Sequence, residues 1–114
     1  MNERGVAAEA HAAAFLLSKG LTIVERNYRS RHGEIDLIAR DGEVLVFVEV
    51  RSRKSNDYGG AAASIIGAKQ RKLTRTALAY LGGLKRTPPC RFDAVLLTAD
   101  LASVEWIKDA FQVS

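Results

Sequence analysis

Two acidic residues, Asp36 and Glu49, lie on neighbouring β-rich runs, and their spacing predicts a paired carboxylate site. The runs cover residues 34–40 and 43–51 and are joined by Asp41-Gly42. An Asp-Gly pair is a strong hairpin signal, because both residues of a two-residue turn of this type need positive φ. We therefore expect a β-hairpin that carries an acid on each strand.

The register of this hairpin follows if Asp41 and Gly42 are the two turn residues. Asp36 then faces Phe47, and Glu34 faces Glu49. Directly opposed residues share a face of the sheet. One face is therefore predicted to carry six side chains: Glu34, Asp36, Leu45, Phe47, Glu49 and Arg51. Asp36 and Glu49 become diagonal neighbours, with Cα atoms roughly 7–8 Å apart. A slip of one residue would send one set of acids to the opposite face.

Glu49 is an acid within an almost continuously apolar run, flanked by Val48 and Val50. Such a run predicts a central strand that is buried on both faces. A buried carboxylate costs several kcal/mol if it stays unpaired, and Mg²⁺ would remove that cost by accepting carboxylate oxygens as ligands. The alternative is that Glu49 pairs with Arg51 or Arg91, while Glu34 and Asp36 point into water.

The remaining patterns predict the elements that position these acids. Residues 3–18 are predicted to form a helix with Val6, Ala10, Ala13 and Leu17 on one stripe, and residues 21–28 a strand. A polar loop at 52–60, a helical turn at 61–66 and a helix at 68–81 should follow the hairpin, with Leu73, Ala77, Leu78 and Leu81 inward. Strands at 91–97 and 103–107 complete the order α-β-β-β-α-β-β. This predicts an α/β fold with a mixed sheet, in a single domain over residues 1–114.

Charge is distributed unevenly along the chain. Residues 1–50 have a balance of −2, residues 51–91 a balance of +9 and residues 92–114 a balance of −3. The basic segment predicts a polyanionic partner, and a solvated helix face is the alternative. The candidate contacts to a nucleic-acid backbone are Arg51, Arg53, Lys54, Lys69, Gln70, Arg71, Lys72 and Arg75.

Composition excludes several other classes. Cys90 is the single cysteine, which excludes an internal disulfide and a cysteine-built zinc site. His11 and His32 do not have metal-ligand spacing. No apolar run approaches the roughly 20 residues that span a bilayer, and the run at 12–17 makes a poor signal peptide. We expect a cytoplasmic protein without a membrane partner.

Three stretches then closely resemble a known family: residues 26–29 (RNYR), 33–39 (GEIDLIA) and 47–53 (FVEVRSR). They are similar to the YraN-like proteins, small bacterial proteins predicted to be endonucleases, and the resemblance covers essentially the whole chain. More distantly, the sequence is similar to archaeal Holliday-junction resolvases and the restriction-endonuclease-like superfamily. The resemblance implies a restriction-endonuclease-like core with a central five-stranded mixed sheet flanked by helices.

The superfamily resemblance also implies a set of site residues. Its metal-dependent motif is an Asp, then Glu-x-Lys on the next strand, with a Glu from the first helix. Matched onto this sequence, the catalytic positions are Asp36, Glu49, Arg51 and Glu9, and the three acids would hold Mg²⁺ or Mn²⁺. Arg51 replaces the motif lysine, and an arginine stays charged and cannot act as a general base. It can still hold a phosphate, so a water activated by the metal is the expected nucleophile.

Three functions follow as hypotheses. The first is a metal-dependent endonuclease that hydrolyses phosphodiester bonds in DNA, with branched DNA as one candidate substrate. The second is a non-catalytic nucleic-acid-binding or adaptor protein with a degenerate nuclease site, and the third is a protein–protein interaction module. Kinship with junction-cutting enzymes also raises a homodimer as a hypothesis. Asp93 either supports the site through Arg91 or is an ordinary surface acid.

Overall fold

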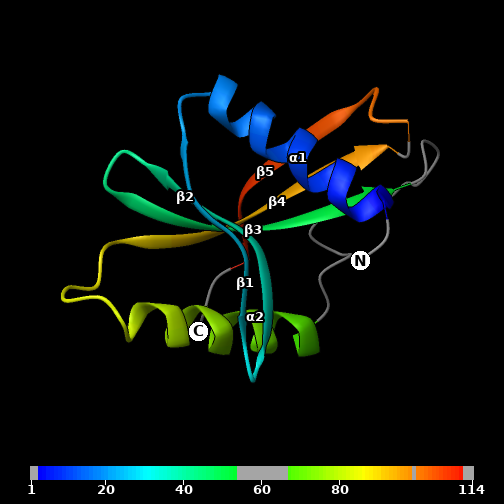
Figure 1. Cartoon of the computed structure of the whole chain (residues 1–114). Coiled ribbons are helices and arrows are strands. Elements are labelled where there is room, and N and C mark those ends of the chain that lie inside the picture. Colours follow the sequence, from blue (N-terminus) through cyan, green and yellow to red (C-terminus); the bar gives the residue numbers. More distant parts are fainter. Residues whose placement is uncertain (1–2, 54–66, 99, 112–114) are drawn as a thin grey trace.

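Seven elements follow one another in the order α-β-β-β-α-β-β that the sequence predicts (Figure 1). The computed structural model describes residues 3–53, 67–98 and 100–111. The elements are α1 (Glu3–Ser18), β1 (Thr22–Ser30), β2 (Gly33–Asp41), β3 (Val44–Arg53), α2 (Gly67–Leu81), β4 (Cys90–Thr98) and β5 (Val104–Phe111). All five strands extend beyond their predicted bounds, β5 by the most, since it continues to Phe111 instead of ending at residue 107. Most of the predicted loop and the helical turn at 61–66 lie outside the described residues.

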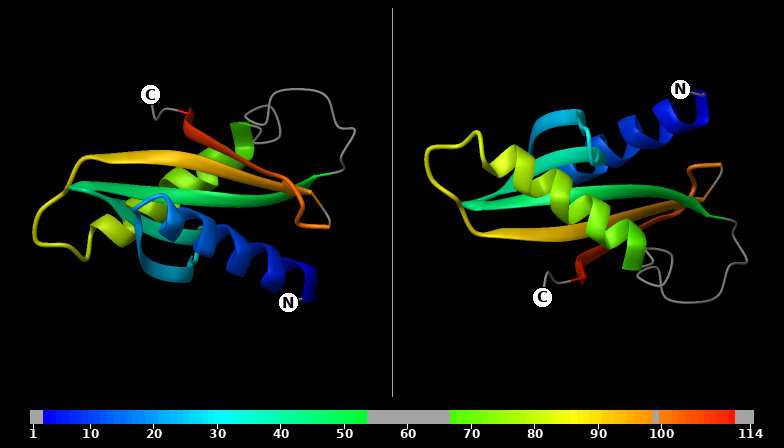
Figure 2. Two further views of the ribbon diagram at one scale, coloured as in Figure 1. Left: turned by 90° about the horizontal axis from the view of Figure 1, so that it is seen from above. Right: turned by 90° about the horizontal axis from the view of Figure 1, so that it is seen from below.

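The five strands form one mixed sheet in the order β1-β2-β3-β4-β5. Strands β3 and β4 are parallel, and the other neighbouring pairs are antiparallel. The prediction that the apolar run is a central strand is confirmed, since β3 lies in the middle of the sheet. Its side chains alternate between two cores, with Val46 and Val48 on the α1 face and Leu45 and Phe47 on the α2 face. Figure 2 shows the two helices on opposite faces of the sheet.

Helix α1 packs on the sheet through small residues, and the predicted stripe is correct at Ala13 but wrong at Val6, Ala10 and Leu17. The buried positions are Ala8, Ala12, Ala13 and Leu16, whereas Val6 and Leu17 are about half exposed. The small side chains of the alanines allow the helix backbone to approach the sheet closely.

Helix α2 covers the other face, and one of its predicted inward residues is wrong. Leu73 and Ala77 are buried as predicted, but Leu78 is 61% exposed. Thr76 is fully buried instead. Its hydroxyl donates to the carbonyl oxygen of Lys72 at 2.8 Å, which satisfies the polar group within the helix. Neither described helix combines the length and apolarity needed to cross a membrane.

The β2–β3 hairpin exists as predicted, but its register differs by two residues. The strands pair from Asp41 opposite Val44 to Leu37 opposite Val48, so Gly42 and Glu43 form the turn. Gly42 has a φ of 61° and occupies the first turn position, which is the glycine position of a II′ hairpin turn. Asp36 is therefore one step beyond the last pair, level with Glu49, and does not face Phe47.

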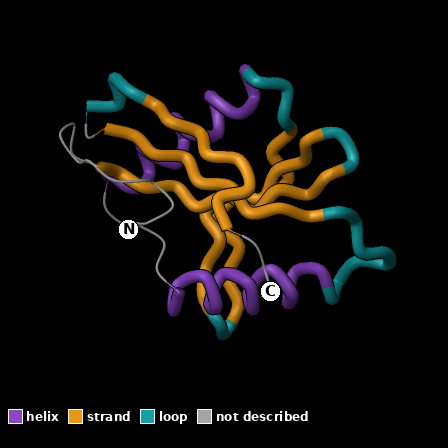
Figure 3. Tube along the Cα trace, turned by 180° about the vertical axis from the view of Figure 1, so that it is seen from behind, coloured by secondary structure: helices purple, strands orange, loops and turns teal. Residues whose placement is uncertain are grey.

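A kink in the β1–β2 hairpin interrupts the alternation of side chains at Asp36. Ile35 packs in the α2 core and Leu37 in the α1 core, although residues two apart in a regular strand share a face. Across the hairpin at the same level, Asn27 has a φ of 53°. Glu34, Asp36 and Glu49 therefore do not come together through the regular alternation of one flat hairpin, because β2 leaves β3 at this point and the hairpin runs beside α2 (Figure 3).

Candidate metal centre

Asp36 occupies the point where β2 separates from β3. Its Oδ2 accepts a hydrogen bond of 2.8 Å from the backbone N–H of Val50. A buried backbone donor needs a partner, and here the carboxylate takes the place of the strand that has turned away. The kink therefore fixes the position of Asp36 between α1 and the central strand.

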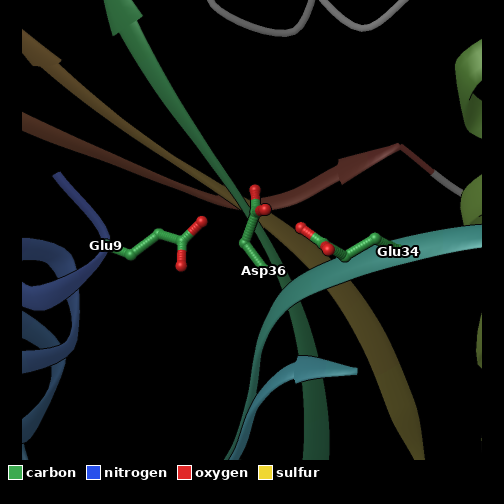
Figure 4. A group of neighbouring side chains, drawn as sticks. All are labelled: Glu9, Glu34 and Asp36. Carbon is green, nitrogen blue, oxygen red and sulfur yellow. The ribbon is translucent and has the colours of Figure 1, made fainter. Parts of the chain in front are cut away.

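Two further acids converge on Asp36 from different elements. Glu9 comes from α1 and Glu34 from β2, and one carboxylate oxygen of each of the three residues lies within 4.8 Å of the others. Figure 4 shows the three carboxyl groups turned toward one another. The alternative in which Glu34 and Asp36 point into water is therefore wrong. Glu34 belongs to this cluster, although sequence reasoning did not assign it as a metal ligand.

Glu49 is buried as predicted, with 6% of its surface exposed, and it is paired. Its Oε1 lies 2.6 Å from Nζ of Lys69 and 3.6 Å from Nε of Arg51. Arg91 instead contacts Asp41 and Asp93. The sequence alternative of a pair with Arg51 is thus present. The shorter contact, with Lys69 at the start of α2, was not predicted.

The four acids act on one another electrostatically. Burial, followed by the charge of Glu49, raises the pKa of Asp36 to about 7, against the lowering effect of the hydrogen bond from Val50. Burial also raises the pKa of Glu9, while a side-chain hydrogen bond with Asn27 opposes that shift. A buried acid among acids is stabilised by a proton or a cation.

Asn27 is a residue of this site that sequence reasoning missed. Its left-handed backbone directs the side chain to Glu9, and asparagine is among the few residues that adopt this conformation readily. The available signal was an asparagine within a β-rich run, where this residue type is depleted.

The donor set fits a hard divalent cation. Glu9, Glu34 and Asp36 offer carboxylate oxygens, the ligand type that Mg²⁺ takes from proteins together with water and phosphate. Sequence reasoning named Glu9, Asp36 and Glu49. The geometry brings Glu9 and Asp36 together with Glu34, and holds Glu49 beside them with a lysine already in contact.

The predicted basic residues divide into two groups. Arg51 and Lys69 lie at the carboxylates. On α2, Arg71, Lys72 and Arg75 are exposed, and Gln70 is half-buried. Arg53 ends β3, and Lys54 lies outside the described residues. The part of the site formed by α2 is therefore basic along its exposed side.

Fold and carboxylate cluster together define the class: an α/β protein with the architecture of a restriction-endonuclease-like core. The chain belongs to the uncharacterised protein family UPF0102, whose model matches residues 8–97, and the YraN-like resemblance is thereby confirmed. It is 54% identical over 112 residues to a UPF0102 protein of Nitrosomonas europaea, covering 97% of this chain and 95% of the relative. A UPF0102 protein of Psychromonas ingrahamii is 48% identical over 111 residues, covering 97% of this chain and 91% of the relative.

Proposed function

We propose that the protein is a metal-dependent endonuclease that hydrolyses phosphodiester bonds in DNA. The observation that carries the proposal is the convergence of Glu9, Glu34 and Asp36, beside the buried Glu49, at one kink of the sheet. Clustered acids with a perturbed pKa, next to cations, are typical of sites that bind a metal and act on phosphate.

The proposed role of each residue follows from its chemistry. A divalent cation, when bound, supplies Lewis-acid polarisation of the phosphate and lowers the pKa of the attacking water. Glu9, Glu34 and Asp36 would hold that ion, and Val50 keeps Asp36 oriented through its N–H. Arg51 keeps its proton at all relevant pH, so it serves to bind and stabilise phosphate charge and not to accept a proton.

Incubation with single-stranded, duplex and four-way-junction DNA, each with Mg²⁺ or Mn²⁺, tests the proposal. Wild-type protein should cleave at least one substrate, and the variant combining Asp36→Ala and Glu49→Ala should lose at least ~100-fold of that rate. Glu43→Ala, an exposed acid in the β2–β3 turn, is the matched control and should cleave normally. Absence of cleavage on all three substrates, or cleavage that persists in the double variant, would overturn the proposal.

A second candidate, a non-catalytic nucleic-acid-binding protein, is favoured by one contact. The 2.6 Å ion pair between Lys69 and Glu49 neutralises the buried acid without a metal. Calorimetric titration with Mn²⁺ separates the two functions. Binding that is lost in Asp36→Ala supports the nuclease. Salt-dependent DNA binding without Mn²⁺ binding supports the second candidate, and absence of both supports a protein–protein interaction module.

A further inference from the structure

The β1–β2 hairpin carries a group of cations, although the segment that contains it has a net negative charge. Residues 1–50 are acidic overall, yet Arg26, Arg29 and Arg31 follow one another along β1 and its turn. All three are exposed, and the side chain of Arg29 is 68% exposed. The acids of the same segment that offset this charge include the cluster at the kink.

Arg29 lies directly beside the carboxylate cluster. Its Nε is 2.6 Å from Oε2 of Glu34, and Glu34 is one of the three acids that converge at Asp36. Lys69 contacts Glu49 from α2. The acids are therefore bordered by a cation from the hairpin and by another from the helix.

The turn of the hairpin is held close to α2. A Cβ atom at Gly33 would lie 3.3 Å from Oγ1 of Thr76 and 3.9 Å from Cβ of Lys72, so the hairpin backbone packs against this part of the helix. The N–H of His32 donates to Oγ of Ser30 at 3.0 Å and shapes the turn. In Figure 3 the two strands pass alongside α2, with their turn just beyond it. The turn that carries Arg31 thus lies beside the segment of α2 that carries Lys72.

We propose that the β1–β2 hairpin is part of the nucleic-acid-binding surface, with Arg29 and Arg31 contacting backbone phosphates next to the carboxylate cluster, alongside Lys69 and Lys72 of α2. The partner is a phosphodiester backbone, because guanidinium groups bind phosphate oxygens in bidentate fashion and the two groups of cations flank the acids. This inference rests on the proposed function, since Arg29 and Lys69 contact acids of the proposed site.

The test is the binding of labelled duplex and four-way-junction DNA, measured by fluorescence anisotropy over a range of NaCl with Ca²⁺ in place of Mg²⁺. The variant combining Arg29→Gln and Arg31→Gln should bind at least about tenfold more weakly. Its plot of log K against log salt should be shallower by about 2, because each lost phosphate contact removes about one counterion. The matched control combines Arg40→Gln, near the other end of β2, with Lys108→Gln on β5, and its slope should stay that of wild type.

Two comparisons distinguish a direct phosphate contact from an effect on the carboxylate cluster. Arg31→Gln alone leaves the Arg29–Glu34 pair intact and should lower the slope by about 1, which supports a direct phosphate contact. Affinity and slope that stay at wild-type values in the hairpin variant overturn the inference while leaving the proposed function in place. A wild-type protein that binds neither DNA overturns both. Loss of Mn²⁺ binding in the hairpin variant, with normal DNA binding by Arg31→Gln, would assign Arg29 to the carboxylate cluster and overturn the inference.

Discussion

Two aspartates of the sheet, the buried Asp93 of β4 and the half-buried Asp36 of β2, have opposite surroundings. Asp93 is 1% exposed, and donors reach both of its carboxylate oxygens. Nε of Arg91 lies 3.0 and 3.2 Å from the two oxygens, Nε1 of Trp106 donates at 2.9 Å, and the N–H of Asp109 donates at 2.9 Å. Asp36 accepts the backbone N–H of Val50 and otherwise lies among Glu9, Glu34 and Glu49.

The difference separates an aspartate whose acceptor positions are used within the fold from an aspartate that faces other acids, the arrangement that we propose binds a metal. A buried carboxylate with all its acceptor positions used stabilises the strands that supply the donors. A buried carboxylate that faces other carboxylates destabilises the metal-free protein, and that instability is what a cation relieves. The sequence alternative that Asp93 is a surface acid is wrong. Arg91 links it to Asp41 and not to the carboxylate cluster.

The largest expected change in the free energy of unfolding comes from replacing Asp93, the buried aspartate of β4. Asp93→Ala removes one of the two carboxylates that contact Arg91 and takes away the buried acceptor of the Trp106 and Asp109 N–H groups, so the free energy of unfolding should fall by about 3–5 kcal/mol. Urea denaturation followed by Trp106 fluorescence measures it. A loss below about 1 kcal/mol would show that this network behaves like a surface ion pair and would remove the contrast with Asp36.

For Asp36 we expect the opposite result, a gain in the free energy of unfolding when its charge is removed. At pH 8 without metal, Asp36→Asn should raise the free energy of unfolding by about 1–3 kcal/mol, because the amide keeps an acceptor for Val50 and removes the repelling charge. The same variant should lose Mn²⁺ binding in calorimetry. Glu43→Gln, in the exposed turn, should change neither quantity. A destabilised Asp36→Asn would mean that the carboxylate supports the metal-free fold.

The pH dependence of the free energy of unfolding gives a second test of the role of Asp36. The pKa of Asp36 is about 7 in the folded protein against 3.8 as its ordinary value, so the folded state binds more protons between these limits. The contribution of Asp36 to the free energy of unfolding therefore falls as pH rises from about 4 to about 7. The stability difference between Asp36→Asn and wild type should grow across that window and level off above it. A difference that is constant with pH would contradict the raised pKa.

The smallest expected effect concerns Asn27, which orients Glu9. Asn27→Gly tolerates the φ of 53° and removes only the side chain, so it should weaken Mn²⁺ binding about tenfold with little change in folding. Asn27→Ala adds roughly 1–2 kcal/mol of backbone strain and serves as the comparison. Calorimetric titration and urea denaturation of both variants separate orientation from strain. Mn²⁺ affinity that is unchanged in Asn27→Gly would remove Asn27 from the site.

Prediction from sequence was accurate where one local pattern determined the element, as for the central strand. It failed for the register of the hairpin and for most of the buried face of α1. The apolar run around Glu49 predicted a central strand, and the structure confirms it. The turn was found, but its register shifted by two residues because Gly42 occupies the first turn position and not the second. The buried face of α1 was predicted correctly at Ala13, but the helix is turned so that Ala8, Ala12 and Leu16 are buried in place of Val6, Ala10 and Leu17.

By itself, the sequence determined the order of the elements, the central strand and the presence of an acid within it. Periodicity and turn residues act over a few positions, so a single chain is enough to read them. Only the tertiary structure decided that β2 kinks at Asp36, that Lys69 contacts Glu49, and that Arg29 and Asn27 border the acids. These contacts join residues from different elements, and their geometry depends on how helices and strands pack together, which no local pattern contains.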